Sequence, residues 1–227
     1  AKWLRDGESG WAPESFFAVH NWWHLALFQL EADQNAEVLK LYDGPIRGGQ
    51  SNIILDMVDA SALLWRLQMR GIDVGNRWEA IADRWQPQGE DRLYAFNDVH
   101  AVLALLGAGR RDEAERVVSV MAQTAHKQSD NAAMTREVGL PLGRALLAFE
   151  QGSYPAVIEI LRPLRNIAGR FGGSHAQRDL IDLTLIEAAQ RGGQPGLVRA
   201  LANERLALKP NSPLAHRYRD RGSRKAA

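Results

Sequence analysis

A pair of histidines separated by one helical turn is the best candidate for chemistry in this chain. His20 and His24 lie four positions apart, which places both imidazoles on one face of a helix. Helices with two histidines use this spacing to bind zinc or iron. A third ligand would come from one of four residues, namely His100, His175, Asp59 or Asp179. The acid that follows the first histidine in H-E-x-x-H hydrolases is absent, because Asn21 stands there. Acid–base chemistry without a metal, with His100 or His175 oriented by an aspartate, is the alternative.

Polar residues also form stripes on other segments that would face inward in a stack of helical hairpins. We expect these stripes to converge on one concave groove, with Trp23 and Trp65 as its apolar walls. In that groove Asp59 and Asp98 would contact hydrogen-bond donors. Arginines bind carboxylates in a bidentate manner, and three of them would do so here, namely Arg66, Arg70 and Arg178. The predicted groove residues are His20, Trp23, His24, Glu31, Asp56, Asp59, Trp65, Arg66, Asn97, Asp98, His100, His175, Arg178 and Asp179.

Each of these residues also has a purely structural explanation. Histidine pairs on a Trp-rich helix are usually packed and hydrogen-bonded to neighbouring turns, and Asp and Arg on adjacent helices often form ion pairs between repeats. Burying ionisable groups is costly, however, and a stack built only for stability would not need so many of them on its inner faces. For the set as a whole we therefore favour a functional groove.

The elements that must position these residues form an internal repeat. An apolar helix, a short break and a second amphipathic helix recur five times, with breaks 38 to 43 residues apart. The breaks fall at Asp33, Gly71, Gly109, Gly152 and Gly193. Small or β-branched residues stand five positions after four of these breaks, where two helices must approach closely, at Val38, Ala114, Val157 and Val198. Ser174 and Gln177 predict a capping box at the start of the ninth main helix.

This repeat predicts an all-α protein, a right-handed α-α superhelix of stacked helical hairpins. We expect one helical repeat domain of about five hairpins over residues 1–216 and a basic flexible tail over residues 217–227. One of the loops expected between helices covers residues 86–91.

Composition narrows the possible functions. The chain has no cysteine, so disulfides, thiolate nucleophiles and Cys-based zinc sites are excluded. Its net charge of +1 and its lack of interleaved aromatic and basic residues argue against a nucleic-acid partner. No apolar run reaches the ~18 residues that a membrane span needs. We expect a cytoplasmic protein without a cofactor or an assigned metal.

Several phrases resemble known families. The turn "GSYPAV" (152–157) matches the tetratricopeptide pattern, although the period here is longer. More specifically, the chain is similar to the tetratricopeptide repeat protein 38 family through "AVHNWWHLALFQLE" (18–31), "DASALLWRLQMRGIDVGNRW" (59–78), "FNDVHA" (96–101), "GLPLGRALLAFEQGSY" (139–154) and "GGSHAQRD" (172–179). Members are about twice this length, so the resemblance implies that this chain covers the C-terminal half. It implies a fold and no settled activity.

Three functions fit these observations. The first is an interaction module whose groove holds a protein or peptide segment. The second is an enzyme or metal-binding protein that uses the same His/Asp residues. The third is a structural half that packs on an N-terminal region or on a second copy in a homo-oligomer.

Overall fold

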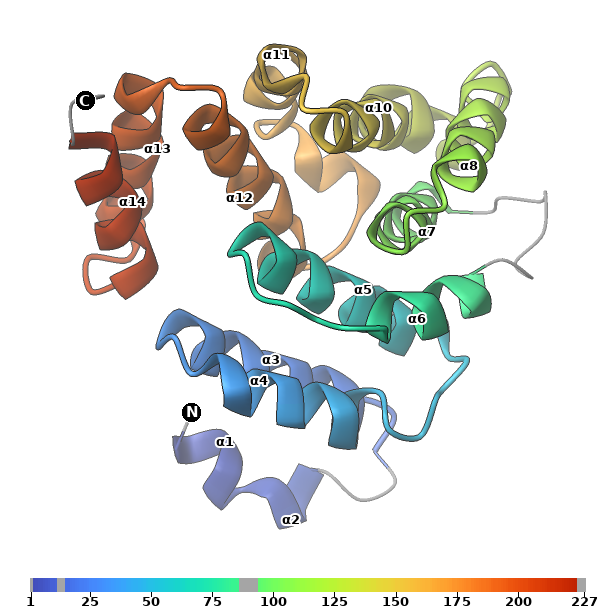
Figure 1. Ribbon diagram of the computed structural model, residues 1–227. Coiled ribbons are helices and arrows are strands. Elements are labelled where there is room, and N and C mark those ends of the chain that lie inside the picture. The colour runs from blue at the N-terminus through green and yellow to red at the C-terminus, as the bar shows by residue number, and fades with distance from the viewer. Residues whose placement is uncertain (1, 12–14, 86–93, 224–227) are drawn as a thin grey trace.

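The computed structural model describes residues 2–11, 15–85 and 94–223, and within these ranges every regular element is a helix (Figure 1). The predicted all-α class with helical repeats is therefore confirmed. The α-helices are α1 (Lys2–Asp6), α2 (Glu8–Trp11), α3 (Ala18–Glu31), α4 (Asn35–Leu41), α5 (Ile54–Met69), α6 (Arg77–Trp85), α7 (Ala95–Gly107), α8 (Arg111–Thr124), α9 (Asp130–Met134), α10 (Leu140–Glu150), α11 (Tyr154–Leu164), α12 (His175–Arg191), α13 (Pro195–Leu208) and α14 (Pro213–Ser223). Short π- or 3₁₀-helical turns are η1 (Tyr42–Ile46), η3 (Thr135–Gly139) and η4 (Ala168–Phe171). The loop expected at 86–91 lies outside the described residues.

Among the described residues, five helical hairpins form the body of the molecule, and they are the five that the repeat predicts. They pair α3 with α4, α5 with α6, α7 with α8, α10 with α11 and α12 with α13. All five predicted break residues adopt positive φ, from +59° at Asp33 to +75° at Gly152. Glycine has no Cβ to clash in this left-handed region, and aspartate tolerates it, so the chain reverses where the sequence predicts.

The small residues inside the hairpins are buried as expected. Val38, Ala114 and Val157 are fully inaccessible and Val198 is almost so. Each lies near the start of the second helix of its pair, where a larger side chain would push the two helices apart. The five-residue offset from the break therefore marks the hairpin contact.

The C-terminal segment differs from its prediction. Residues 217–223 belong to α14, which packs along α13, and residues 224–227 lie outside the described part. Leu214, Tyr218 and Gly222 follow one another at four-residue spacing and are buried. A charge-rich segment with one apolar stripe is an amphipathic helix, so a flexible tail over all of 217–227 is wrong.

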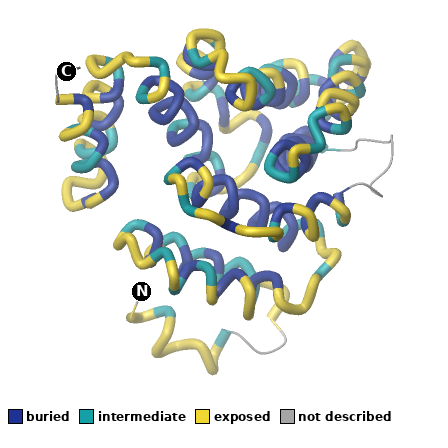
Figure 2. Tube along the Cα trace, in the orientation of Figure 1, coloured by how far each residue is buried: buried dark blue, intermediate teal, exposed yellow. Residues whose placement is uncertain are grey.

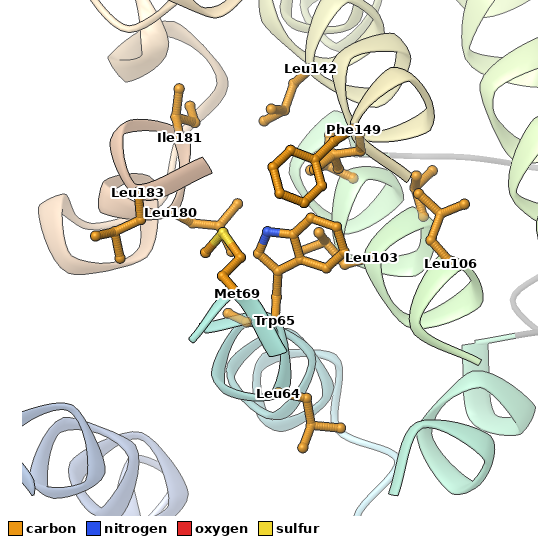
Figure 3. Close-up of a cluster of buried hydrophobic side chains, with 14 of the residues drawn as sticks. Leu64, Trp65, Met69, Leu103, Leu106, Leu142, Phe149, Leu180, Ile181 and Leu183 are labelled. Carbon is orange, nitrogen blue, oxygen red and sulfur yellow. The ribbon is translucent and has the colours of Figure 1, made fainter. Parts of the chain in front are cut away.

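The array closes on itself, because α12 packs against α5 as well as against α11 and α13. Figure 2 shows buried residues concentrated along α5, α7 and α12. In Figure 3, Trp65 of α5 is surrounded by Phe149 of α10, Leu103 of α7 and Leu180 of α12. Its indole Nε1–H donates to Thr184 Oγ1 over 3.1 Å. Trp65 is thus a core residue, and its predicted role as a groove wall is wrong because α12 covers it.

Two glycines let α12 begin close to α7. Gly172 and Gly173 have φ of +89° and +76°, and a Cβ on either would lie within 2.4 Å of Tyr94 or Phe96. The predicted capping box follows at once: Ser174 Oγ accepts from Gln177 N–H, and Gln177 Oε1 accepts from Ser174 N–H. The start of α12 is therefore fixed against α5 and α7. None of the described helices combines the length and apolarity that crossing a bilayer requires.

Candidate functional site: a histidine pair beside a cationic cleft

Asp59 in the middle of α5 joins three elements that are distant in sequence. Its carboxylate is inaccessible to solvent. Oδ2 lies 2.7 Å from Nδ1 of His20 on α3, and Oδ1 accepts a 3.1 Å hydrogen bond from the Gln177 amide on α12. The capping box holds Gln177 through its other amide atom, Oε1, so Gln177 reaches Asp59 in one fixed orientation. Side chains of α3, α5 and the start of α12 therefore meet at this carboxylate.

His20, which contacts Asp59, also contacts His24. Its ring stacks on Trp23 at 5.3 Å with an interplanar angle of 18°, and its Nε2 lies 3.2 Å from Nε2 of His24. Asp59 accepts only, so His20 carries a hydrogen on Nδ1; this tautomer is assigned from its partners. The result is a hydrogen-bonded series Asp59–His20–His24, which we call the histidine relay.

The pKa values of the two histidines are shifted in opposite directions. The hydrogen bond to Asp59 raises the pKa of His20 above 6.5, against an opposing effect of burial. Burial and the neighbouring His20 lower the pKa of His24. The pair therefore binds a first additional proton more readily than a second one, and His20 is the preferred position for it.

The raised pKa of His20 predicts a stability that falls with rising pH. A group that binds its proton more tightly when folded contributes fully below its unfolded pKa of about 6.5, and this contribution is lost as the pH rises through the folded pKa. We expect the urea midpoint of the wild type to exceed that of His20→Gln by more at pH 6 than at pH 8.

The exposed histidine His126 provides the matched control. His126→Gln should leave the urea midpoint close to wild type at both pH values. A difference between wild type and His20→Gln that is the same at pH 6 and pH 8 would remove His20 as the source of the pH dependence.

Arg66 is a buried cation without an acidic partner. Its guanidinium donates to Ala62 O and Ala176 O over 2.9 and 2.7 Å and lies 5.6 Å from the Trp23 ring centroid. No carboxylate of the described residues lies within the 4.0 Å of an ion pair. Burial lowers the pKa of Arg66 to about 10, so it remains cationic at neutral pH. Asp179 and Asp59 favour the charge from beyond ion-pair distance. A buried cation without a directly bound carboxylate favours an anion nearby.

Arg66 lines a cavity of about 730 Å³ between α3, α5, α12 and the end of α13, which we call the cationic cleft. Its polar lining is Arg66, Arg70, Arg165, Asn166, His175, Arg178, Asp179, Asp182 and Lys209. The two acids are already paired, since Asp179 accepts from Arg205 over 2.5 Å and Asp182 lies 2.6 Å from Arg165.

Two further cations in the cleft have no carboxylate within ion-pair distance among the described residues. Arg178 donates to the carbonyls of Gly172 and Gly173, and Lys209 follows the end of α13. Together with Arg66 they leave the cleft with a local excess of positive charge. The cleft therefore favours an anionic ligand.

A second cavity of about 450 Å³ adjoins the cleft and shares Leu27, Ala176 and Lys209 with it. We call it the His24 cavity; its other lining residues are His24, Phe28, Glu31, Pro210, Asn211 and Ser212. Glu31 accepts hydrogen bonds from Ser212 Oγ and Leu214 N–H, so its carboxylate caps the start of α14. Phe28 is 54% exposed beside it. The histidine relay thus ends at a largely apolar cavity.

The α7 residues of the predicted set lie apart from both cavities. His100 is buried with its Nδ1 2.7 Å from Phe96 O, and burial lowers its pKa to about 4. Asp98 is also buried, and Asn97 is half-buried in the first turn of α7. None of the three lines either cavity, and His100 and Asp98 are buried in the core, so their predicted place in a shared groove is wrong.

Asp56 has a supporting place only. It is buried one turn before Asp59, its own burial raises its pKa, and its charge raises the pKa of His20. It lines neither cavity. Trp23 is likewise fully buried beneath His20 and Arg66, so it supports the site from below without walling it.

Several site residues were missed by the sequence argument. Arg165, Lys209 and Arg205 lie at the ends of second helices, whereas the predicted polar stripes lie on first helices. Gln177 was recognised only as a capping residue. A search of helix termini as well as first helices would have found the cations, whereas the Gln177–Asp59 contact spans 118 residues and has no local pattern.

The histidine pair does not present a metal site. His20 and His24 direct Nε2 atoms at each other, and the remaining His20 nitrogen is bound to Asp59. Among the described residues, no group of three or more His, Asp or Glu side chains is placed to hold a metal ion. The geometry fits hydrogen-bond and proton chemistry.

Comparisons with known proteins give no assignment. No protein-family model matches the chain, and no solved structure matches it significantly. The resemblance to the tetratricopeptide repeat protein 38 family therefore stays a prediction.

Proposed function

We propose that this chain is an interaction module that binds an acidic segment of a protein or peptide in the cationic cleft. The observation that carries the proposal is the excess of cations there: within the described part of the chain, Arg66, Arg178 and Lys209 have no carboxylate within ion-pair distance, while the acids of the cleft are paired. Arg66, Arg70 and Arg178 are the three arginines that the sequence singled out for carboxylates, and all three line the cleft.

The lining also favours a partly apolar segment. Leu27, Leu30 and Ile181 contribute apolar surface to the cleft, and the exposed Phe28 continues it into the His24 cavity. A peptide would bury this surface while its carboxylates contact the cations. A charge-assisted hydrogen bond contributes about 1.5–3 kcal/mol, so two or three of them act together with the buried apolar surface against the cost of association.

The wider assignment is part of the same proposal. A divergent tetratricopeptide repeat protein of the tetratricopeptide repeat protein 38 family, located in the cytoplasm, would use such a cleft for a partner protein. The acidic segment would then belong to a separate protein, to an N-terminal region or to a second copy of the chain.

The test is binding of a fluorescein-labelled peptide that alternates Glu with Leu and Phe, measured by fluorescence anisotropy. We expect saturable binding that weakens as salt rises, and no binding of the same peptide with Lys in place of Glu. Lys209→Glu should raise the dissociation constant at least about tenfold, because it adds repulsion where attraction existed.

Lys127→Glu is the matched control, since Lys127 is an exposed lysine outside both cavities and the change in net charge is the same. It should change the dissociation constant less than about twofold. Equal weakening by the two variants, or equal binding of the Glu and Lys peptides, contradicts a role for the cleft.

A further inference from the structure

The histidine relay has an open end that peptide binding in the cleft does not use. His24 lines the His24 cavity, and its Nδ1 makes no hydrogen bond to any described residue. His24 is half-buried at the wall of this cavity. The other three ring nitrogens of the pair are occupied, two by each other and one by Asp59.

We infer that the His24 cavity is a second subsite of the proposed anionic ligand, where His24 Nδ1–H donates to a carboxylate or carbonyl oxygen and binding takes up one proton from solvent. This inference rests on the proposed function. It adds a second contact to the ligand. An oxygen of the ligand, next along from the acidic group that binds in the cleft, accepts a hydrogen bond from His24.

The proton count follows from the hydrogen bonds. Asp59 accepts, so His20 Nδ1 must carry a hydrogen. One hydrogen must lie between the two Nε2 atoms, on one ring or the other. A donor at His24 Nδ1 is a third hydrogen, whereas two neutral imidazoles carry only two.

A neutral pair therefore presents a lone pair at His24 Nδ1, which repels an acceptor oxygen. Adding one proton turns this nitrogen into a donor. The positive charge is shared through the Nε2 contact with His20, and Asp59 offsets it from the buried end. No covalent bond to the ligand forms or breaks; the solvent loses one proton and the complex gains it.

The charges around the pair support this exchange. On α5, Asp59 and Asp56 favour the added proton. On α3, Glu31 is held by Ser212 and Leu214. From α12 and the residue that follows α13, the titratable or charged groups are His175, Arg178, Asp179 and Lys209. The excess cations among them attract the ligand's oxygen.

The experiment is titration calorimetry of the Glu/Leu/Phe peptide at pH 7.5 in phosphate and in Tris, whose ionisation enthalpies differ. The dependence of the observed enthalpy on the buffer gives the number of protons taken up. We expect net uptake approaching one proton for the wild type, and an affinity that falls up to about tenfold per pH unit above neutrality. His24→Gln should reduce the uptake to near zero, whereas His126→Gln, at an exposed position outside both cavities, should retain it.

Asp59→Asn gives a second test, in which His24 and its contact with the ligand are retained. Gln177 donates to the oxygen of residue 59 and so fixes the amide with its NH₂ toward His20 Nδ1. His20 Nδ1 then accepts, and two hydrogens suffice for the Nε2 contact and for a donor at His24 Nδ1. This variant should bind the peptide with no proton uptake.

The outcomes separate the two claims. Absence of any peptide binding overturns the proposed function and this inference together. Binding without proton uptake by the wild type overturns the inference alone, as does uptake that persists in His24→Gln or in Asp59→Asn.

Discussion

Replacing Trp65 with alanine should lower the free energy of unfolding by about 3–5 kcal/mol, the range for truncating a large buried aromatic residue. Trp65 is 2% exposed and lies where α5, α7, α10 and α12 meet (Figure 3). Its removal opens a cavity beside Phe149 and leaves Thr184 without its indole partner. Far-UV circular dichroism during urea unfolding measures the effect without depending on tryptophan fluorescence.

Trp3 provides the control, because it is 81% exposed on α1. Trp3→Ala should change the free energy of unfolding by less than about 0.5 kcal/mol, as expected for an exposed position. If the two variants unfold at the same urea concentration, the packing of α12 over Trp65 is not what closes the array.

The hairpins could be predicted from sequence because their determinants are local. A left-handed residue at each break and, in four of the five hairpins, a small residue five positions later are features of one helix–turn–helix unit, and both lie within a short window of sequence. Asp33 followed by Val38 satisfies them as well as Gly152 followed by Val157. The same holds for the capping box at Ser174.

The closure of the array could not be predicted in this way. Trp65 and Thr184 are 119 positions apart, and nothing in the periodicity of α5 or α12 shows that these helices meet. When that contact is unknown, periodicity does not distinguish an inward-facing residue in the core from one that lines a groove. The sequence therefore predicts both Trp65 and His100 in an open groove, although α12 covers Trp65 and His100 is buried in α7.

The C-terminal segment has a high positive charge, which suggests a flexible tail, and a helical periodicity, which predicts a helix. The segment from Pro213 to Ser223 is rich in arginine, but its apolar residues recur at helical spacing. Periodicity is the stronger indicator, because an amphipathic helix needs only one apolar stripe to pack. Weighing it above net charge would have predicted α14.

The second large effect concerns Asp59. We expect Asp59→Ala to lower the free energy of unfolding by about 2–4 kcal/mol at pH 6, near the range for breaking a buried ion pair but reduced because the His20 side chain is 17% exposed. Alanine leaves two donors without an acceptor: the Nδ1–H of His20 and the buried amide of Gln177. Since α3, α5 and α12 meet at this carboxylate, their mutual positions should loosen as well.

Asp59→Asn separates the charge from the hydrogen bonds. It retains an oxygen for Gln177 and a polar contact to His20, so we expect it to lose only about 1 kcal/mol. Asp6→Ala is the surface control, because Asp6 pairs with Lys2 on exposed α1 and such pairs contribute about 0–1 kcal/mol. Urea midpoints at pH 6 rank the three variants. Equal losses for Asp59→Ala and Asp6→Ala would mean that the carboxylate does not hold the three helices together, and the site built around it would lose its foundation.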